Sequence, residues 1–81
     1  MSEASDIRRT FLEFAAARSD GATFCPSEVA RKLSKDWRPL MPKVRDVAAQ
    51  LIEDGKLVCT QRGKPAHPLK TSGAIRLARP G

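Results

Sequence analysis

The chain has 81 residues, of which 41% are hydrophobic and 30% charged, and its formal net charge is +6. This composition is typical of one small globular domain, and it argues against a second domain and against disorder along the whole length. No apolar run reaches the roughly 18–20 residues of a membrane span, and the N-terminus lacks the basic and then apolar order of a signal peptide. We therefore expect a cytoplasmic protein with no membrane partner, folded as one domain over residues 1–81 and frayed at 1–5 and 79–81.

The first predicted element is a helix near the N-terminus. Ser5 and Asp6 are suitable capping residues, because a side-chain oxygen and a negative charge both favour a helix start. Apolar residues then recur at the spacing of one helical face: Ile7, Phe11, Phe14 and Ala15. Arg18 falls in the expected last turn, and Gly21 is suited to the left-handed conformation that ends a helix.

A short β-prone segment at residues 22–24 leads into a second predicted helix. Pro26 fits the first helical position, and Glu28 lies three residues after Cys25, at the spacing of a capping box. The helix is expected to run for about two turns and to end near Ser34, with an apolar face made of Val29, Ala30 and Leu33.

The third predicted helix is the best determined. Pro39 and Pro42 disfavour helix at the residues before them, so we expect the helix to become regular at Pro42 and to close at Gly55. Its buried stripe is predicted to consist of Val44, Val47, Ala48, Leu51 and Ile52. Its outer face is predicted to carry Pro42, Asp46, Ala49, Gln50 and Glu53, with Lys43 and Arg45 on the flanks.

Two strands are predicted after the third helix. Residues 56–61 and 74–77 are rich in β-branched and apolar residues, and they are separated by a loop rich in glycine, proline and basic residues. The order of elements is helix, short strand, helix, helix, strand, long loop, strand. This order predicts an α+β winged helix, in which a helix-turn-helix core of three helices carries a small antiparallel β-hairpin as the wing.

The chain also resembles a family of small bacterial winged-helix proteins classed as a domain of unknown function. The resemblance covers roughly residues 6–78 and is carried by Phe24-Cys25-Pro26-Ser27-Glu28-Val29-Ala30, by Trp37-Arg38-Pro39-Leu40-Met41 with Val44-Arg45, by Gly55-Lys56-Leu57 and by Gln61-Arg62-Gly63-Lys64. It implies the winged-helix fold but no activity.

Charge along the chain is segregated. Residues 1–54 contain nine basic and nine acidic residues, whereas residues 55–81 contain six basic residues and no acid. Uncancelled positive charge on a wing is typical of contact with the phosphate backbone of nucleic acid. We therefore predict contacts with duplex DNA from the wing and the start of the third helix, through Arg38, Lys43, Arg45, Gln50, Arg62, Lys64 and Lys70.

The third helix limits what such contacts can read. Among its outer residues only Gln50 is suited to hydrogen bonding with base edges, while Asp46 and Glu53 would repel phosphates. The prediction is therefore backbone contact with modest sequence selectivity. Trp37 admits two interpretations, a core plug or, with Arg38, a stacking surface for a base or an anion.

Other functional classes remain open at this point. The mixed outer face of the third helix, with Leu40, Met41 and Leu69 as exposed candidates, suits a protein-interaction or homodimerisation module instead. Cys25 at a helix start is a possible redox-sensitive thiol, since a helix dipole stabilises a thiolate, or an ordinary packed residue. We expect no enzyme activity, no cofactor and no metal, because neither a zinc-ligand spacing nor a nucleophile with an evident base is present.

Overall fold

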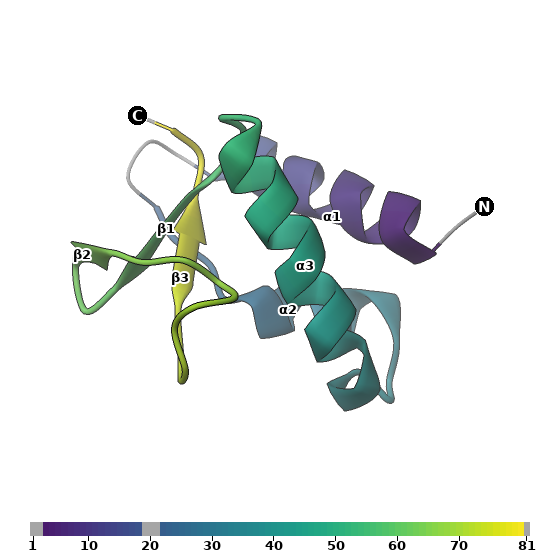
Figure 1. Cartoon of the computed structure of the whole chain (residues 1–81). Helices are drawn as coiled ribbons and strands as arrows, with labels where there is room; N and C mark the ends of the chain where they lie inside the picture. Colours follow the sequence, from purple (N-terminus) through teal and green to yellow (C-terminus); the bar gives the residue numbers. More distant parts are fainter. Residues whose placement is uncertain (1–2, 19–21, 81) are drawn as a thin grey trace.

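A computed structural model of the chain describes residues 3–18 and 22–80. Its elements are α1 (Glu3–Ala17), α2 (Pro26–Leu33), a 3-10 turn η1 (Arg38–Leu40), α3 (Met41–Glu53), β1 (Val58–Gln61), β2 (Lys64–Pro65) and β3 (Arg76–Ala78). The helices pack together on one side and the small antiparallel sheet lies beside them (Figure 1). The α+β winged-helix-like architecture expected from the sequence is confirmed. None of the helices in residues 3–18 and 22–80 is long and apolar enough to cross a membrane.

The core lies between the three helices and the sheet. Its largest fully buried side chains come from every part of the chain: Ile7, Phe11, Phe24, Val29, Val44, Leu51, Leu57, Ile75 and Leu77. Phe24 stands at its centre, because its ring centroid lies 6.2 Å from that of Phe11 and 5.5 Å from that of Phe14. Such offset and edge-to-face contacts add to the free energy gained by burial.

The helix boundaries agree with the capping chemistry except at the N-terminus. Helix α1 begins at Glu3, so the predicted start at Ser5 and Asp6 was wrong, and the predicted stop at Gly21 lies outside the described residues. Helix α2 begins at Pro26 as predicted, and the Glu28 carboxylate accepts the Cys25 backbone N–H at 2.7 Å.

Helix α3 begins one residue before Pro42, because η1 leads directly into it. It closes at Gly55, where φ is +75°. The Gly55 N–H donates to Ile52 O at 3.0 Å and the Lys56 N–H donates to Leu51 O at 2.8 Å, which is the Schellman arrangement.

The sheet contains a strand that the sequence analysis missed. Its order is β2-β1-β3, so the predicted pairing of β1 with β3 holds, while β2 forms a tight hairpin with β1 inside the predicted loop. Positive φ at Arg62 (55°) and Gly63 (81°) matches the type I′ turn, whose twist suits a two-residue hairpin. We call residues 58–65 the wing hairpin and residues 66–75 the return loop.

Phe24 also ties the sheet to the helices. It forms an isolated antiparallel bridge with Leu77, with the Phe24 N–H donating to Leu77 O at 2.8 Å and the Leu77 N–H donating to Phe24 O at 2.7 Å. The β-prone segment predicted before α2 is thus reduced to one bridge. One residue therefore joins β3, α1 and the start of α2.

We expect Phe24→Ala to lower the free energy of unfolding by about 3–5 kcal/mol, because it removes a fully buried ring and leaves a cavity. Urea denaturation monitored by circular dichroism measures this change. The control is Leu12→Ala on α1, whose side chain is 36% exposed and whose removal should cost less than about 1 kcal/mol. Equal losses in the two variants would contradict the central place of Phe24.

Candidate nucleic-acid interface

The return loop is held against α3 by one side chain. The guanidinium of Arg45 donates to three backbone carbonyls of the loop, those of Pro68 at 2.8 Å, Thr71 at 3.0 Å and Gly73 at 2.7 Å. A charged donor makes stronger hydrogen bonds than a neutral one, and a planar fork reaches several acceptors at once. We call these three hydrogen bonds the Arg45 clamp.

Gln61 at the end of β1 reinforces the clamp. Its side-chain amide donates to Ser72 O at 2.9 Å and to Ala74 O at 3.3 Å. Together the two side chains satisfy five carbonyls of the return loop, which lacks regular structure of its own. The segment predicted as a long loop is therefore tied to both α3 and β1.

The clamp also changes the place of Arg45 among the predicted contact residues. Arg45 was predicted to face a phosphate from the flank of the third helix. The structure instead places it half-buried, with its guanidinium directed into the return loop. Its geometry supports a positioning role, in which it sets where the wing stands relative to α3.

The cations of the wing remain directed at solvent. Arg62 lies in the hairpin turn, Lys64 on β2 and Lys70 in the return loop, and all three are exposed. Within residues 3–18 and 22–80 none of them takes part in a salt bridge. The structure thus presents positive charge on a short, twisted hairpin whose backbone is fixed at both ends.

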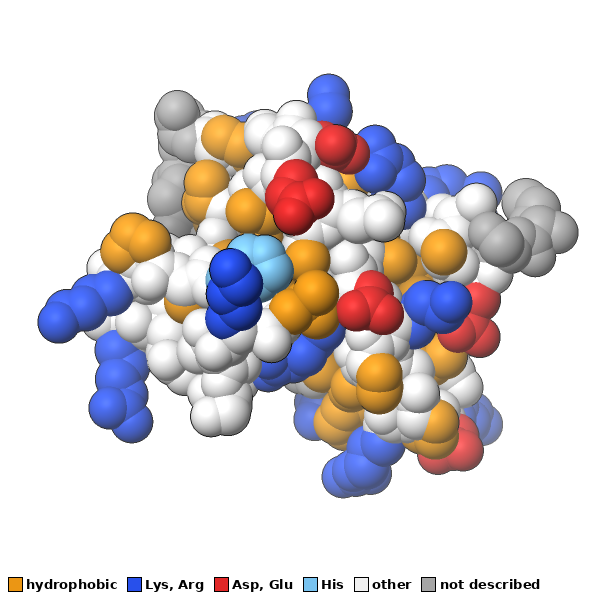
Figure 2. Space-filling model, viewed as in Figure 1, with side chains coloured by type: hydrophobic (Ala, Val, Ile, Leu, Met, Phe, Trp, Pro, Cys, Tyr) orange, Lys and Arg blue, Asp and Glu red, His pale blue; other side chains and the backbone are white. Residues whose placement is uncertain are grey.

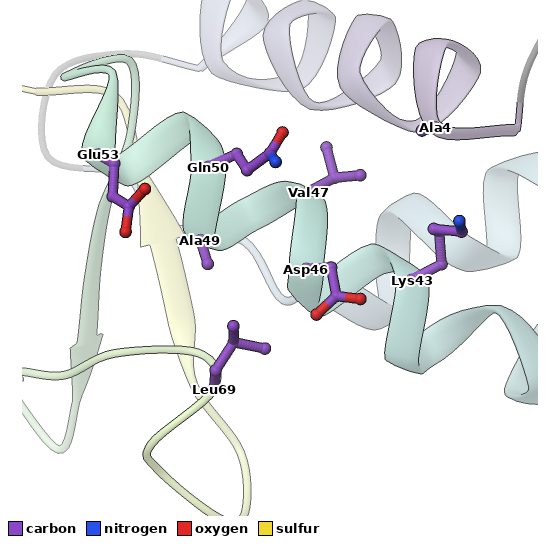
Figure 3. Close-up of a pocket in the computed structure, with 8 residues that line it drawn as sticks. All are labelled: Ala4, Lys43, Asp46, Val47, Ala49, Gln50, Glu53 and Leu69. Atoms are coloured by element: carbon purple, nitrogen blue, oxygen red, sulfur yellow. The ribbon is translucent and has the colours of Figure 1, made fainter.

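The outer face of α3 is a shallow, mixed surface. Figure 3 shows the side chains around a pocket of about 390 Å³, in which Lys43, Asp46, Gln50 and Glu53 extend from α3 while Leu69 rises from the return loop toward the helix. Ala49, predicted to be exposed on this face, is only 4% exposed. The return loop lies over the middle of α3, which helical periodicity alone does not reveal.

Charges of both signs are exposed on this side of the molecule. Figure 2 shows acidic side chains over α3 in the middle of the view, with Lys and Arg side chains both beside them and projecting at the edges. The wing hairpin and the start of α3 lie at opposite ends of Figure 1. The predicted contact residues therefore do not converge on one continuous basic surface. Arg62 and Lys64 lie on the wing hairpin and Arg38 lies near the start of α3, while Lys43 shares the pocket over α3 with Asp46 and Glu53.

The second basic end is built on Trp37. The guanidinium carbon of Arg31 and that of Arg38 each lie 4.7 Å from the centroid of the Trp37 ring. The ring itself is half-buried and packs against the core. Trp37 thus serves both as a packing residue and as a platform for two arginines. The sequence analysis missed Arg31, because it lies on α2 and no pattern linked it to Trp37.

The two cysteines occupy different environments. Cys25 is half-buried, and its sulfur accepts a hydrogen bond from the Arg76 guanidinium at 2.8 Å. Cys59 is buried on β1, and burial raises the pKa of its thiol, while the charge of Arg45 partly opposes this rise.

In the described residues no group of three or more His, Cys, Asp or Glu side chains is arranged to hold a metal ion.

Comparison with known proteins gives a family and no activity. The family described as "Protein of unknown function (DUF3253)" matches residues 4–80. No curated protein matches the chain.

We expect Arg45→Lys to loosen the return loop, since an ammonium cannot reach three carbonyls with the geometry of a guanidinium. The free energy of unfolding should fall by about 2 kcal/mol, and the Lys70 amide, bonded to His67 O at 3.1 Å, should exchange with solvent faster. Urea denaturation and amide hydrogen exchange measure the two effects. Arg8→Lys is the control, because Arg8 makes only an exposed ion pair with Asp54 at 3.5 Å. Unchanged Lys70 exchange would contradict the clamp.

The raised pKa of Cys59 predicts a dependence of stability on pH. The folded protein holds the thiol proton more tightly than the unfolded chain does, so this contribution is complete below the unfolded pKa of about 8.5 and is lost as pH rises through the folded value. The stability of the wild type should therefore fall more steeply above pH ~8.5 than that of Cys59→Ala. Parallel curves for the two proteins would refute the prediction. Denaturation at a series of pH values measures the difference.

Proposed function

The chain belongs to the DUF3253 family, whose function is unknown, and we propose that it is a nucleic-acid-binding protein that contacts the phosphate backbone of duplex DNA. The observation that carries the proposal is the wing hairpin. It holds Arg62 in a tight turn and Lys64 on β2 directly after it, in a stretch of the chain without acids. Lys70 on the return loop adds a third exposed cation.

The contacts are of a kind that favours affinity over sequence reading. Lys and Arg side chains neutralise phosphates whatever the base sequence. On the outer face of α3, Gln50 is exposed but is flanked by Asp46 and Glu53, which share its pocket. Because carboxylates are repelled by phosphates, α3 is poorly suited to enter a groove deeply. The DNA-binding surface is therefore the wing, assisted by Arg38 and Lys43 near the start of α3.

A second candidate function rests on the pocket over α3. Leu69 is 56% exposed beside Asp46 and Glu53, which suits an apolar and basic segment of a protein partner or of a second copy. Leu40 and Met41, the other expected contact residues, are half-buried against the core and do not contribute in the same way. A protein complex that survives nuclease treatment would favour this function. So would a dimer, detected as a solution mass twice that of one chain, that the Leu69→Ser variant no longer forms.

The proposal predicts salt-dependent binding to duplex DNA of any sequence. If about four phosphates are neutralised, log K plotted against log salt concentration has a slope near −3.6. We expect Arg62→Ala/Lys64→Ala to weaken binding to all duplexes alike and to make the slope shallower by about 1.8. Fluorescence anisotropy of labelled duplexes measures both quantities.

The matched control is Arg8→Ala/Arg9→Ala on α1, which removes the same charge from a helix that carries no part of the wing. Its binding should stay within about threefold of the wild type. Absence of duplex binding by the wild type at low salt would rule out the proposed function.

A further inference from the structure

A second concentration of positive charge lies at the connection between α2 and α3. Residues 31–38 contain four basic side chains and a single acid, Asp36. All four basic residues are exposed, and none of them forms a salt bridge within the part of the chain that the structure describes. We call this group the tryptophan patch: Arg31, Lys32, Lys35, Trp37 and Arg38.

The two arginines of the patch are held in place without a carboxylate. Each guanidinium lies 4.7 Å from the Trp37 ring centroid, a distance typical of cation–π contact. Stacking restricts the side chains, so less conformational freedom is lost when the fork binds an anion. Two like charges held on one ring also repel each other, and a bound anion relieves that repulsion.

Helix stabilisation alone does not account for the patch. Arg31 and Lys32 lie in the last turn of α2, where cations favour the helix dipole. Lys35 and Arg38 lie beyond that turn, and Arg38 stands at the beginning of η1, next to the start of α3. A cation near a helix start gains no stabilisation from the helix dipole, so the dipole does not account for the charge there.

The patch and the wing hairpin are placed at two ends of the molecule. In Figure 1 the connection from α2 to α3 lies at the lower right and the turn before β2 at the far left, with α3 between them. The domain measures 31 × 26 × 21 Å. The major groove of duplex DNA is about 12 Å wide, so a body of this length can touch the phosphates on both rims of one groove.

We propose that the tryptophan patch binds a second segment of the phosphodiester backbone, across a groove from the segment that the wing hairpin contacts. This inference rests on the proposed function and adds a second phosphate-binding surface to it. It also accounts for the acids of α3. If the two basic ends contact the rims, Asp46 and Glu53 face the open groove between them. They then lie away from the phosphates, which would otherwise repel them.

The test uses Trp37, the single tryptophan of the chain, as a reporter inside the patch. An end-labelled duplex of about 20 base pairs is titrated with the full chain, and label anisotropy and Trp37 emission are recorded in parallel. We expect the emission to change with the same midpoint as the anisotropy. In Arg62→Ala/Lys64→Ala the emission should still respond, at higher DNA concentration.

Two patch variants measure the contribution to binding. Arg31→Ala/Arg38→Ala removes the two arginines stacked on Trp37. Lys32→Ala/Lys35→Ala removes two exposed lysines and leaves Trp37 and its arginines in place. The second variant therefore tests the patch even if the first folds poorly. If the patch binds as well as the wing, about six phosphates are neutralised and the wild-type slope steepens from about −3.6 to about −5.4. Each patch variant is then expected to weaken binding by on the order of tenfold or more at 100 mM salt and to make the slope shallower by about 1.8. Arg8→Ala/Arg9→Ala is again the charge-matched control.

The outcomes separate this inference from the proposed function. If the wild type binds duplex DNA, the wing variant binds weakly and both patch variants bind like the wild type, then the wing alone contacts DNA and the inference is overturned. An emission that stays constant while the anisotropy saturates leads to the same conclusion. If the wild type binds no duplex at low salt, the proposed function fails, and the second contact fails with it.

Discussion

The arrangement of this small protein depends on the Arg45 guanidinium. The return loop contains no helix or strand, although the Lys70 N–H donates to His67 O within it, and three of its carbonyls are satisfied by that single side chain. A loop of this kind would otherwise be expensive to order, because its backbone entropy is lost without compensating contacts. Since Arg45 stands on α3, the clamp ties the return loop, which follows the wing hairpin, to that helix.

The clamp has a consequence for function. It directs the half-buried guanidinium of Arg45 into the return loop rather than toward a ligand, and the loop places Leu69 beside the helix. Arg62 and Lys64 remain exposed on the wing hairpin, Lys70 on the return loop and Arg38 in the tryptophan patch, while Lys43 lies beside the acids of α3. Under the proposed function, such a surface would contact a polyanion at its two ends. It is better suited to gripping a backbone than to inserting a helix among base edges.

The helices were largely predictable because local chemistry sets them. Pro26 and Glu28 start α2, Gly55 ends α3, and the apolar stripe of α3 follows helical periodicity. The predicted start of α1 at Ser5 was wrong, because the helix already begins at Glu3. Capping residues near an N-terminus mark a helix start less sharply than a glycine marks a helix end. The hairpin turn was missed because Arg62, which is not a usual residue for a left-handed position, occupies its first place.

The sequence by itself determined the fold class, the approximate limits of the helices and the excess of positive charge after residue 54, because periodicity, capping and composition are local properties. Only the tertiary structure decided which cations are available to a ligand. Arg45 and Arg62 are identical as sequence symbols, yet one guanidinium is directed into three backbone carbonyls and the other into solvent. Arg31 on α2 and Arg38 on η1 likewise share the Trp37 ring, which the sequence pattern did not indicate. The contacts of Arg45 join residues 23 to 28 positions apart in the chain, and no local pattern records such a pairing.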